Sequence, residues 1–153
     1  MRIVCLLAPL GMALLACGED AETADLSGSL GTIYGLEHTN TRTQRSGDTM
    51  SIEFRNRDGA VVTLSFDIED VNAAGAYTIP TPVAVSFPQY ANPNYDLSAT
   101  GGQLVLERYP TDSDNRISGR FEASVEKASL VSEESEQRSY SVTGQFDTTL
   151  ASP

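Results

Sequence analysis

Strand signals recur about every dozen residues along most of this chain, whereas helix signals are almost absent. From Leu26 onward, runs in which apolar and polar residues alternate are separated by clusters of glycine, proline, asparagine and aspartate. That spacing is typical of all-β sandwiches and barrels. The chain is therefore predicted to be all-β, an antiparallel β-sandwich or partly closed β-barrel of about seven to eight strands.

The clearest unit is a hairpin over residues 50–69. Apolar side chains alternate with polar ones in both arms, at Met50, Ile52 and Phe54 and then at Val62, Leu64, Phe66 and Ile68. Between the arms, residues 56–59 read Asn-Arg-Asp-Gly, and the Asp-Gly pair supplies the positive φ that a tight hairpin turn needs. This segment predicts two antiparallel strands joined by a short turn.

The rest of the chain divides into shorter segments. Residues 75–79 and 83–87 read as strands separated by Pro80-Thr81-Pro82, and the polar segment 39–48 and the proline-containing segment 87–102 read as connections. Residues 102–109, 115–130 and 138–150 follow, joined by the turn-forming segment 110–115 and the acidic segment 132–137. Their lengths predict a C-terminal meander of three antiparallel strands.

Two of these last strands carry nearly the same seven letters, ISGRFEA at 117–123 and VTGQFDT at 142–148. In each copy a glycine, Gly119 or Gly144, shares a strand face with a phenylalanine, Phe121 or Phe146. We expect the repeat to serve packing: one ring covers the bare backbone of the other strand, or the glycines let the sheet bend. Leu26-Ser27-Gly28-Ser29-Leu30 resembles a weaker third copy in a first strand.

The N-terminus has the features of a signal peptide. Arg2 is followed by an almost unbroken apolar run from Ile3 to Ala16 and then by acidic residues. The run is shorter than the about 20 residues that a membrane-spanning helix needs.

Leu14-Leu15-Ala16-Cys17 resembles the lipobox of bacterial lipoproteins. The resemblance implies cleavage after Ala16, acylation of Cys17, and anchoring of the domain through that lipid. The alternative is an ordinary signal peptide with a chance cysteine at its end. The predicted organisation is a signal peptide at 1–16, a lipidated flexible tether at 17–25, and a single β domain at 26–153. Gly18, rather than aspartate, follows the cysteine, which favours the outer membrane, facing periplasm or cell surface.

Charge and cysteine content restrict the chemistry. The precursor has a net charge of −11, and removing residues 1–16, whose only charge is Arg2, leaves −12. Such a surface repels phosphate backbones, so we expect no nucleic acid as a partner. Cys5 leaves with the signal and Cys17 carries the lipid, so no thiol remains for a disulfide, a metal site or a nucleophile. We expect no cofactor.

No catalytic motif stands out. His38 is the only histidine and is interpreted as solvated, the alternative being a catalytic base. Residues 112–115 resemble the start of a calcium loop, but Arg116, Ile117 and Ala123 stand where later ligands or glycine should be. We interpret the segment as a turn, and we predict no catalytic residue and no metal site.

Candidate ligand contacts are Tyr90, Asn92, Asn94 and Tyr95. Two tyrosines and two asparagines near Pro93 offer stacking faces and amide hydrogen bonds of the kind that hold sugars and peptides. The competing interpretation is a packed loop whose tyrosines cap one end of the sandwich.

Five motifs between Gly75 and Thr148 also resemble small secreted bacterial lipoproteins of uncharacterised domain families. They are G-x-Y-T, a tyrosine-rich loop, GG-x-L-x-L, ISG-x-F-x-A and a final V-x-G-x-F. That resemblance implies an all-β domain and no particular activity. The leading interpretation is a membrane-anchored lipoprotein whose β-rich, non-catalytic domain binds an envelope protein or a glycan, or assists assembly. The alternative is an envelope hydrolase with a carboxylate-based site.

Overall fold

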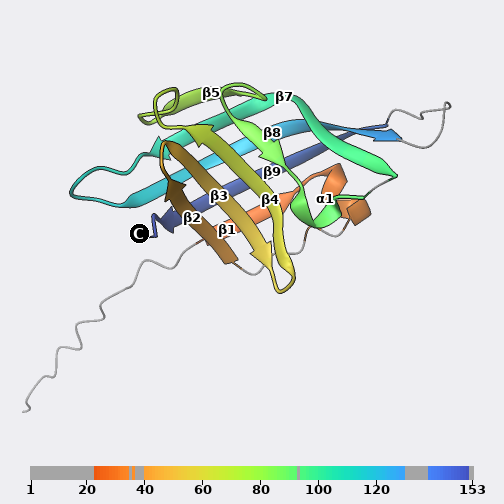
Figure 1. The fold of residues 1–153 in the computed structure, drawn as a ribbon, viewed down its shortest axis with the longest axis horizontal. Coiled ribbons are helices and arrows are strands. Elements are labelled where there is room, and N and C mark those ends of the chain that lie inside the picture. Colours follow the sequence, from red (N-terminus) through yellow and green to blue (C-terminus); the bar gives the residue numbers. More distant parts are fainter. Residues whose placement is uncertain (1–22, 35, 37–39, 93, 130–137, 152–153) are drawn as a thin grey trace, which may run out of the picture.

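The computed structural model describes residues 23–34, 36, 40–92, 94–129 and 138–151. Within these ranges the chain forms nine strands, one short α-helix and one 3-10 helix (Figure 1). In chain order they are β1 (Thr23–Ser27), α1 (Ser29–Tyr34), β2 (Asn40–Ser46), β3 (Thr49–Asn56), β4 (Gly59–Asp67), β5 (Gly75–Ile79), β6 (Ala84–Ser86), η1 (Pro88–Tyr90), β7 (Tyr95–Arg108), β8 (Arg116–Ser129) and β9 (Arg138–Thr149).

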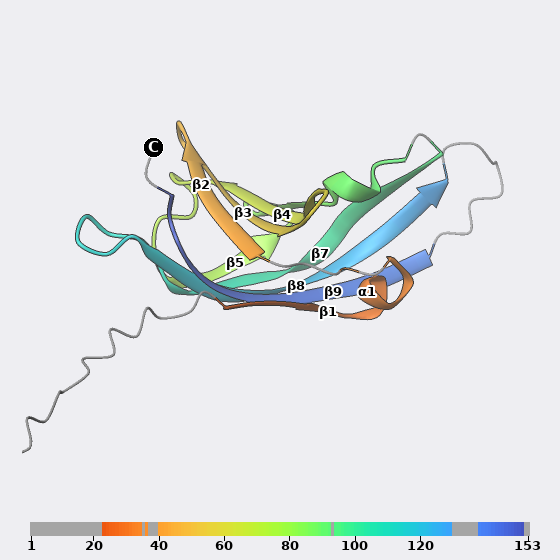
Figure 2. The ribbon, with the colours of Figure 1, turned by 90° about the horizontal axis from the view of Figure 1, so that it is seen from below.

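The strands form two antiparallel sheets that pack face to face (Figure 2). Sheet A has the order β1-β9-β8-β7-β5, and sheet B has the order β2-β3-β4-β6. No ladder closes the two sheets into a barrel along the described strands, so the predicted all-β antiparallel fold is confirmed in its sandwich-like form. The described strands number nine, slightly more than the sequence indicated.

The predicted hairpin is β3 and β4. Ile52 pairs with Leu64 and Met50 with Phe66, so the alternating apolar side chains of both arms point into the sandwich. The register shifts between Phe54 and Arg55, where the second arm carries an extra residue. The Asn56 side-chain oxygen accepts hydrogen bonds from the turn amides of Asp58 and Gly59 at 2.9 and 3.2 Å, which fixes the turn.

The predicted meander is β7, β8 and β9, and it forms the middle of sheet A. Gly119 pairs with Phe146 and Phe121 pairs with Gly144, so each phenylalanine of the repeated segments lies opposite the glycine of the other. Both rings reach Phe54 of sheet B: the ring centroids lie 5.7 Å apart for Phe121 and 6.3 Å apart for Phe146. These three rings join the two sheets at the centre of the core.

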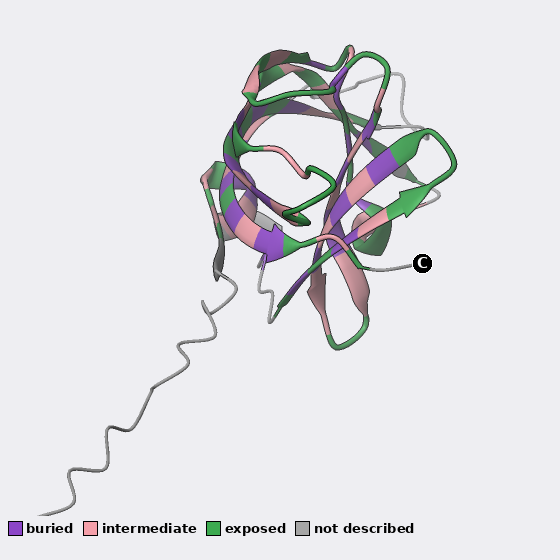
Figure 3. Cartoon of the chain, turned by 90° about the vertical axis from the view of Figure 1, so that its left-hand side faces the viewer, coloured by how far each residue is buried: buried purple, intermediate pink, exposed green. Residues whose placement is uncertain are grey.

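Burial alternates along the strands, as the colour bands in Figure 3 show. On β8, Phe121, Ala123 and Val125 are buried, while Arg120 and Glu122 are exposed. Sheet A therefore has one apolar face against sheet B and one polar face toward solvent.

The end of β9 also contacts sheet B. Leu150, just after β9, forms a parallel bridge with Thr43 of β2, and the Ala151 amide donates to the Thr43 carbonyl oxygen at 3.0 Å. One strand thus takes part in hydrogen bonding on both sheets.

Three expectations need correction. β2 lies in the segment 39–48 that was expected to be a polar connection: its Thr41 and Thr43 are buried and its intervening residues are not. β7 begins at Tyr95, within the predicted loop 87–102, because pairing with β8 extends from Tyr95 to Arg108. Tertiary pairing of this kind overrides weak local strand preference.

Helix α1 was not foreseen, and it explains why the third copy of the repeat fails. β1 ends at Ser27, and Gly28 follows with a φ of 111°. Leu30 is buried, but it belongs to helix α1 and not to a strand. The two predicted strands on either side of Pro80-Thr81-Pro82 belong to different sheets: β5 pairs with β7 and β6 with β4. The proline segment between them crosses from one sheet to the other.

Candidate functional site

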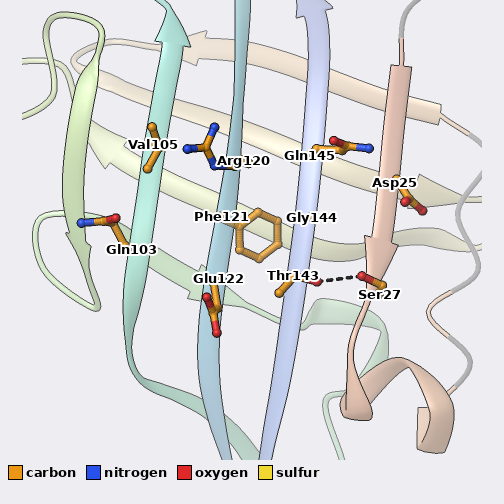
Figure 4. A pocket seen from close by; sticks show the side chains of 10 residues that line it. All are labelled: Asp25, Ser27, Gln103, Val105, Arg120, Phe121, Glu122, Thr143, Gly144 and Gln145. Carbon is orange, nitrogen blue, oxygen red and sulfur yellow. Dashed lines mark hydrogen bonds between the residues drawn. The ribbon is translucent and has the colours of Figure 1, made fainter.

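A pocket of about 420 Å³ lies on the outer face of sheet A, away from sheet B (Figure 4). Its volume is within the ordinary range of small-ligand sites. The lining residues are Asp25, Ser27, Gln103, Val105, Arg120, Phe121, Glu122, Thr143, Gly144 and Gln145.

Strand alternation places eight of these side chains on the solvent face. Phe121 and Gly144 are buried positions of β8 and β9, and the residues on either side of each therefore point outward. The same alternation exposes Gln103 on β7 and Asp25 and Ser27 on β1. The pocket thus depends on the same periodicity that builds the core.

The strand register aligns these residues in two rows across four strands. One row runs Asp25, Gln145, Arg120, Val105, and the other runs Ser27, Thr143, Glu122, Gln103. Adjacent strands lie about 4.8 Å apart and alternate residues about 6.8 Å apart, so the rows cover roughly 14 by 7 Å. We call these eight residues the outer grid.

Part of the outer grid is already bonded. The hydroxyls of Ser27 and Thr143 are 2.7 Å apart, and the Arg120 guanidinium forms an ion pair with the Glu107 carboxylate next to the grid. By contrast, the side chains of Asp25, Gln103, Glu122 and Gln145 have no hydrogen-bond or ion-pair partner among the described residues. Two amides and two carboxylates are therefore available to a ligand.

The electrostatics of the grid are mildly acidic. Asp25 and Glu122 carry two negative charges against the one positive charge of Arg120, which Glu107 also offsets. This agrees in sign with the net charge of the whole chain. An anionic ligand would meet net repulsion here.

The candidate contacts from the sequence lie elsewhere, and none of them lines this pocket. Tyr90 ends η1 and packs against the core, while the Asn92 side-chain oxygen accepts from the Asn94 amide at 2.9 Å. Tyr95 is the first residue of β7. The structure thus separates these four residues between a packed turn and a strand end.

Other singled-out residues fall into two groups. Cys17 and His38 lie outside the described residues. Segment 112–115 forms the predicted turn: the Asp114 amide donates to the Thr111 hydroxyl at 3.2 Å, and the Arg116 amide donates to the Asp114 carboxylate at 3.0 Å. The described ranges contain no cluster of three or more histidine, cysteine or acidic residues arranged to hold a metal.

The phenol of Tyr109 has a clearly shifted pKa. Burial raises the pKa of the Tyr109 phenol above its usual value of 10.0, the positive charge of Arg45 opposes that rise, and Tyr77 adds to it. Tyr109 follows β7 beyond the pocket and does not line it. Its neutral phenol is a structural group at ordinary pH.

The outer grid could not be found from the sequence, because its residues come from four strands far apart in the chain. The one hint in the sequence was that the two repeated segments differ at their exposed positions: the first has Arg120 where the second has Gln145. The register shows that these two residues are neighbours in one row. Their difference is therefore compatible with a mixed polar surface.

Comparison with protein-family models, with curated proteins and with solved structures found no match. Across the described residues, no helix has the length and apolar character required to cross a membrane.

Proposed function

We propose that this chain is a lipid-anchored, non-catalytic binding module of the cell envelope, held at the outer membrane through Cys17, with the outer grid as its ligand-binding surface. The observation that carries the binding part is the alignment of eight outward side chains in two rows, four of them without a partner among the described residues. A pocket of this volume with several convergent polar side chains is the default place for a ligand site.

The short distance along the chain between Cys17 and the grid supports this combination. β1 begins six residues after Cys17, and Asp25 follows Cys17 by eight residues. Eight residues span at most about 28 Å when fully extended. A lipid on Cys17 would therefore keep the outer grid within that reach of the bilayer, where envelope ligands are found.

A hydrolase is the second candidate, because two carboxylates, Asp25 and Glu122, line the same pocket. They lie in different rows with β9 between their strands, so their Cα atoms are roughly 12 Å apart on an ordinary sheet, and side chains that extend outward in parallel from one face keep their carboxyl groups at a similar spacing. Paired carboxyls in glycoside hydrolases are about 5 to 9.5 Å apart. That geometry favours binding over hydrolysis.

The anchor is tested by replacing Cys17 with serine and measuring incorporation of labelled palmitate and partition between membrane and soluble fractions. The other cysteine provides the control, since Cys5→Ser removes a thiol from the signal segment without touching the lipobox. We expect Cys17→Ser to lose the label and Cys5→Ser to keep it. Labelling of the Cys17→Ser protein would overturn the anchor.

The binding surface is tested by pull-down from an envelope extract with the full-length lipoprotein in detergent. The double variant Gln103→Ala, Gln145→Ala removes both free amides of the grid, and Gln44→Ala on β2 of sheet B is the matched control. We expect material retained by the parent and the control to be lost from the double variant. Equal retention by all three would place binding elsewhere.

A further inference from the structure

We infer that the ligand of the outer grid is a neutral, polyhydroxylated molecule, an oligosaccharide in chemical class. This inference rests on the proposed binding function of that surface. It follows from three properties of the grid: its hydrogen-bonding side chains, its net charge, and the pairing of the main chain beneath it within sheet A.

The hydrogen-bonding groups suit hydroxyls. Gln103 and Gln145 each offer an amide that both donates and accepts, while Asp25 and Glu122 offer carboxylates that only accept. A sugar hydroxyl donates one hydrogen bond and accepts others, so it can bridge an amide donor and a carboxylate acceptor on adjacent strands. The register places one such pair in each row, Gln145 beside Asp25 and Gln103 beside Glu122.

The charge of the grid argues against anions. Two carboxylates stand in the pocket, and its one cation, Arg120, is engaged by Glu107. A phosphate, sulfate or nucleic acid would have to displace Glu107 and still face Asp25 and Glu122. A neutral ligand has neither cost.

Over β7, β8 and β9, the backbone under the grid argues against an added peptide strand. β8 and β9 are paired on both sides at the grid, and β7 is paired with β5 and β8 from Gly102 to Leu106. Their main-chain donors and acceptors are thus used within sheet A, so an added peptide strand finds none over these strands. Val105 is the single apolar side chain among the eight, so the surface lacks an apolar hole for a peptide anchor.

The grid also lacks an aromatic ring, because Phe121 faces the core, in contact with Phe54. Stacking of a sugar ring is therefore absent from the binding energy, and hydrogen bonds carry the recognition. We expect dissociation constants of about 0.1 to 1 mM for a single site.

The experiment is isothermal titration of the full-length lipoprotein in detergent micelles with five probes. Three are neutral tetrasaccharides (maltotetraose, cellotetraose and tetra-N-acetylchitotetraose), one is a sulfated tetrasaccharide, and one is tetralysine. The parent, the Gln103→Ala, Gln145→Ala variant and a Gln44→Ala, Gln89→Ala control are compared, the control carrying the same chemical change on β2 and η1. Circular dichroism confirms that all three proteins are folded.

We expect at least one neutral tetrasaccharide to bind the parent and the control equally, and the grid variant about tenfold or more weakly. Three results would overturn the inference. They are binding of tetralysine or the sulfated sugar in preference to all neutral ones, neutral-sugar binding that the grid variant retains, and no neutral-sugar binding at 10-fold excess over the expected constant, about 10 mM. Retention of the palmitate label by Cys17→Ser, which would overturn the anchor, would leave this sugar-binding result unaffected.

Discussion

Gly119 on β8 and Gly144 on β9 occupy equivalent positions in the two repeated segments, yet the structure uses them differently. At Gly144 the space of a missing side chain is filled by other side chains: a Cβ there would overlap the Phe121 ring and lie 2.8 Å from Leu26 Cδ2. At Gly119 the space is filled mainly by main chain: a Cβ would overlap the Val105 carbonyl oxygen and lie 3.2 Å from Leu106 Cα and from the Phe146 ring.

The difference shows that one sequence pattern solves two packing problems. Gly144 allows a ring to cover bare backbone, whereas Gly119 allows β7 to approach β8 closely where the register of these strands shifts between Leu106 and Arg108. The two roles that the sequence left open, cover and curvature, are thus divided between the two glycines. A side chain can rotate away from an added methyl, but a paired backbone cannot without loss of its hydrogen bonds.

The largest expected effect is therefore that of Gly119→Ala. Relief of the overlap with Val105 would require β7 and β8 to separate, so we expect a loss of about 3 kcal/mol or more in the free energy of unfolding, measured by urea titration. Gly101→Ala is the control, since a Cβ at Gly101 of β7 meets nothing within 4 Å. A stable Gly119→Ala protein would mean that the strands move apart easily.

A smaller loss, about 1 to 2 kcal/mol, is expected for Gly144→Ala. The Phe121 ring and the Leu26 side chain obstruct the added methyl, and both have rotatable bonds. The same urea titration gives the value. A cost equal to that of Gly119→Ala would remove the distinction between the two glycines.

A pair of double-mutant cycles sharpens the comparison. Combining Gly144→Ala with Phe121→Leu removes the obstructing ring, so we expect about 1 kcal/mol of favourable coupling in unfolding free energy. Combining Gly119→Ala with Phe146→Leu leaves the Val105 carbonyl in place, and we expect coupling near zero, within about 0.5 kcal/mol. Similar coupling in both cycles would contradict the backbone role of Gly119.

The smallest effects belong to the outer face of the same strands. Arg120→Ala and Gln145→Ala remove exposed side chains, and the Arg120–Glu107 ion pair is open to solvent, so each change should shift the unfolding free energy by less than about 0.5 kcal/mol. Thermal unfolding followed by circular dichroism is sufficient to check this. A large shift for either residue would show that the grid supports the fold.

The parts of the fold that were predictable are those in which local pattern and tertiary partner agree. The hairpin of β3 and β4 has strict alternation and a turn at 56–59, and the β8 and β9 strands have alternation with matched glycines. β2 was not predicted because its buried residues are Thr41 and Thr43, and threonine counts as polar in a pattern based on hydrophobicity. α1, with six residues, is too short to show helical periodicity.

The candidate site was less predictable than the fold. The outer grid is created by register, which aligns Asp25 with Gln145 and Arg120 although 120 and 95 positions separate Asp25 from them in the chain. Single residues such as Gln103 carry no sign of this arrangement. Tyr90, by contrast, attracted attention as a tyrosine near proline and proves to pack against the core.

The bonds that join the end of β9 to β2 have a consequence for how the protein comes apart. Leu150 bridges Thr43, and Ala151 donates to the same residue, so detaching β9 would both divide sheet A between β1 and β8 and free the β2 edge of sheet B. Opening of either sheet alone therefore requires that the hydrogen bonds between the end of β9 and β2 break first. Amide hydrogens in β3 and in β8 should accordingly exchange with solvent at similar, slow rates, as those of a single cooperative unit.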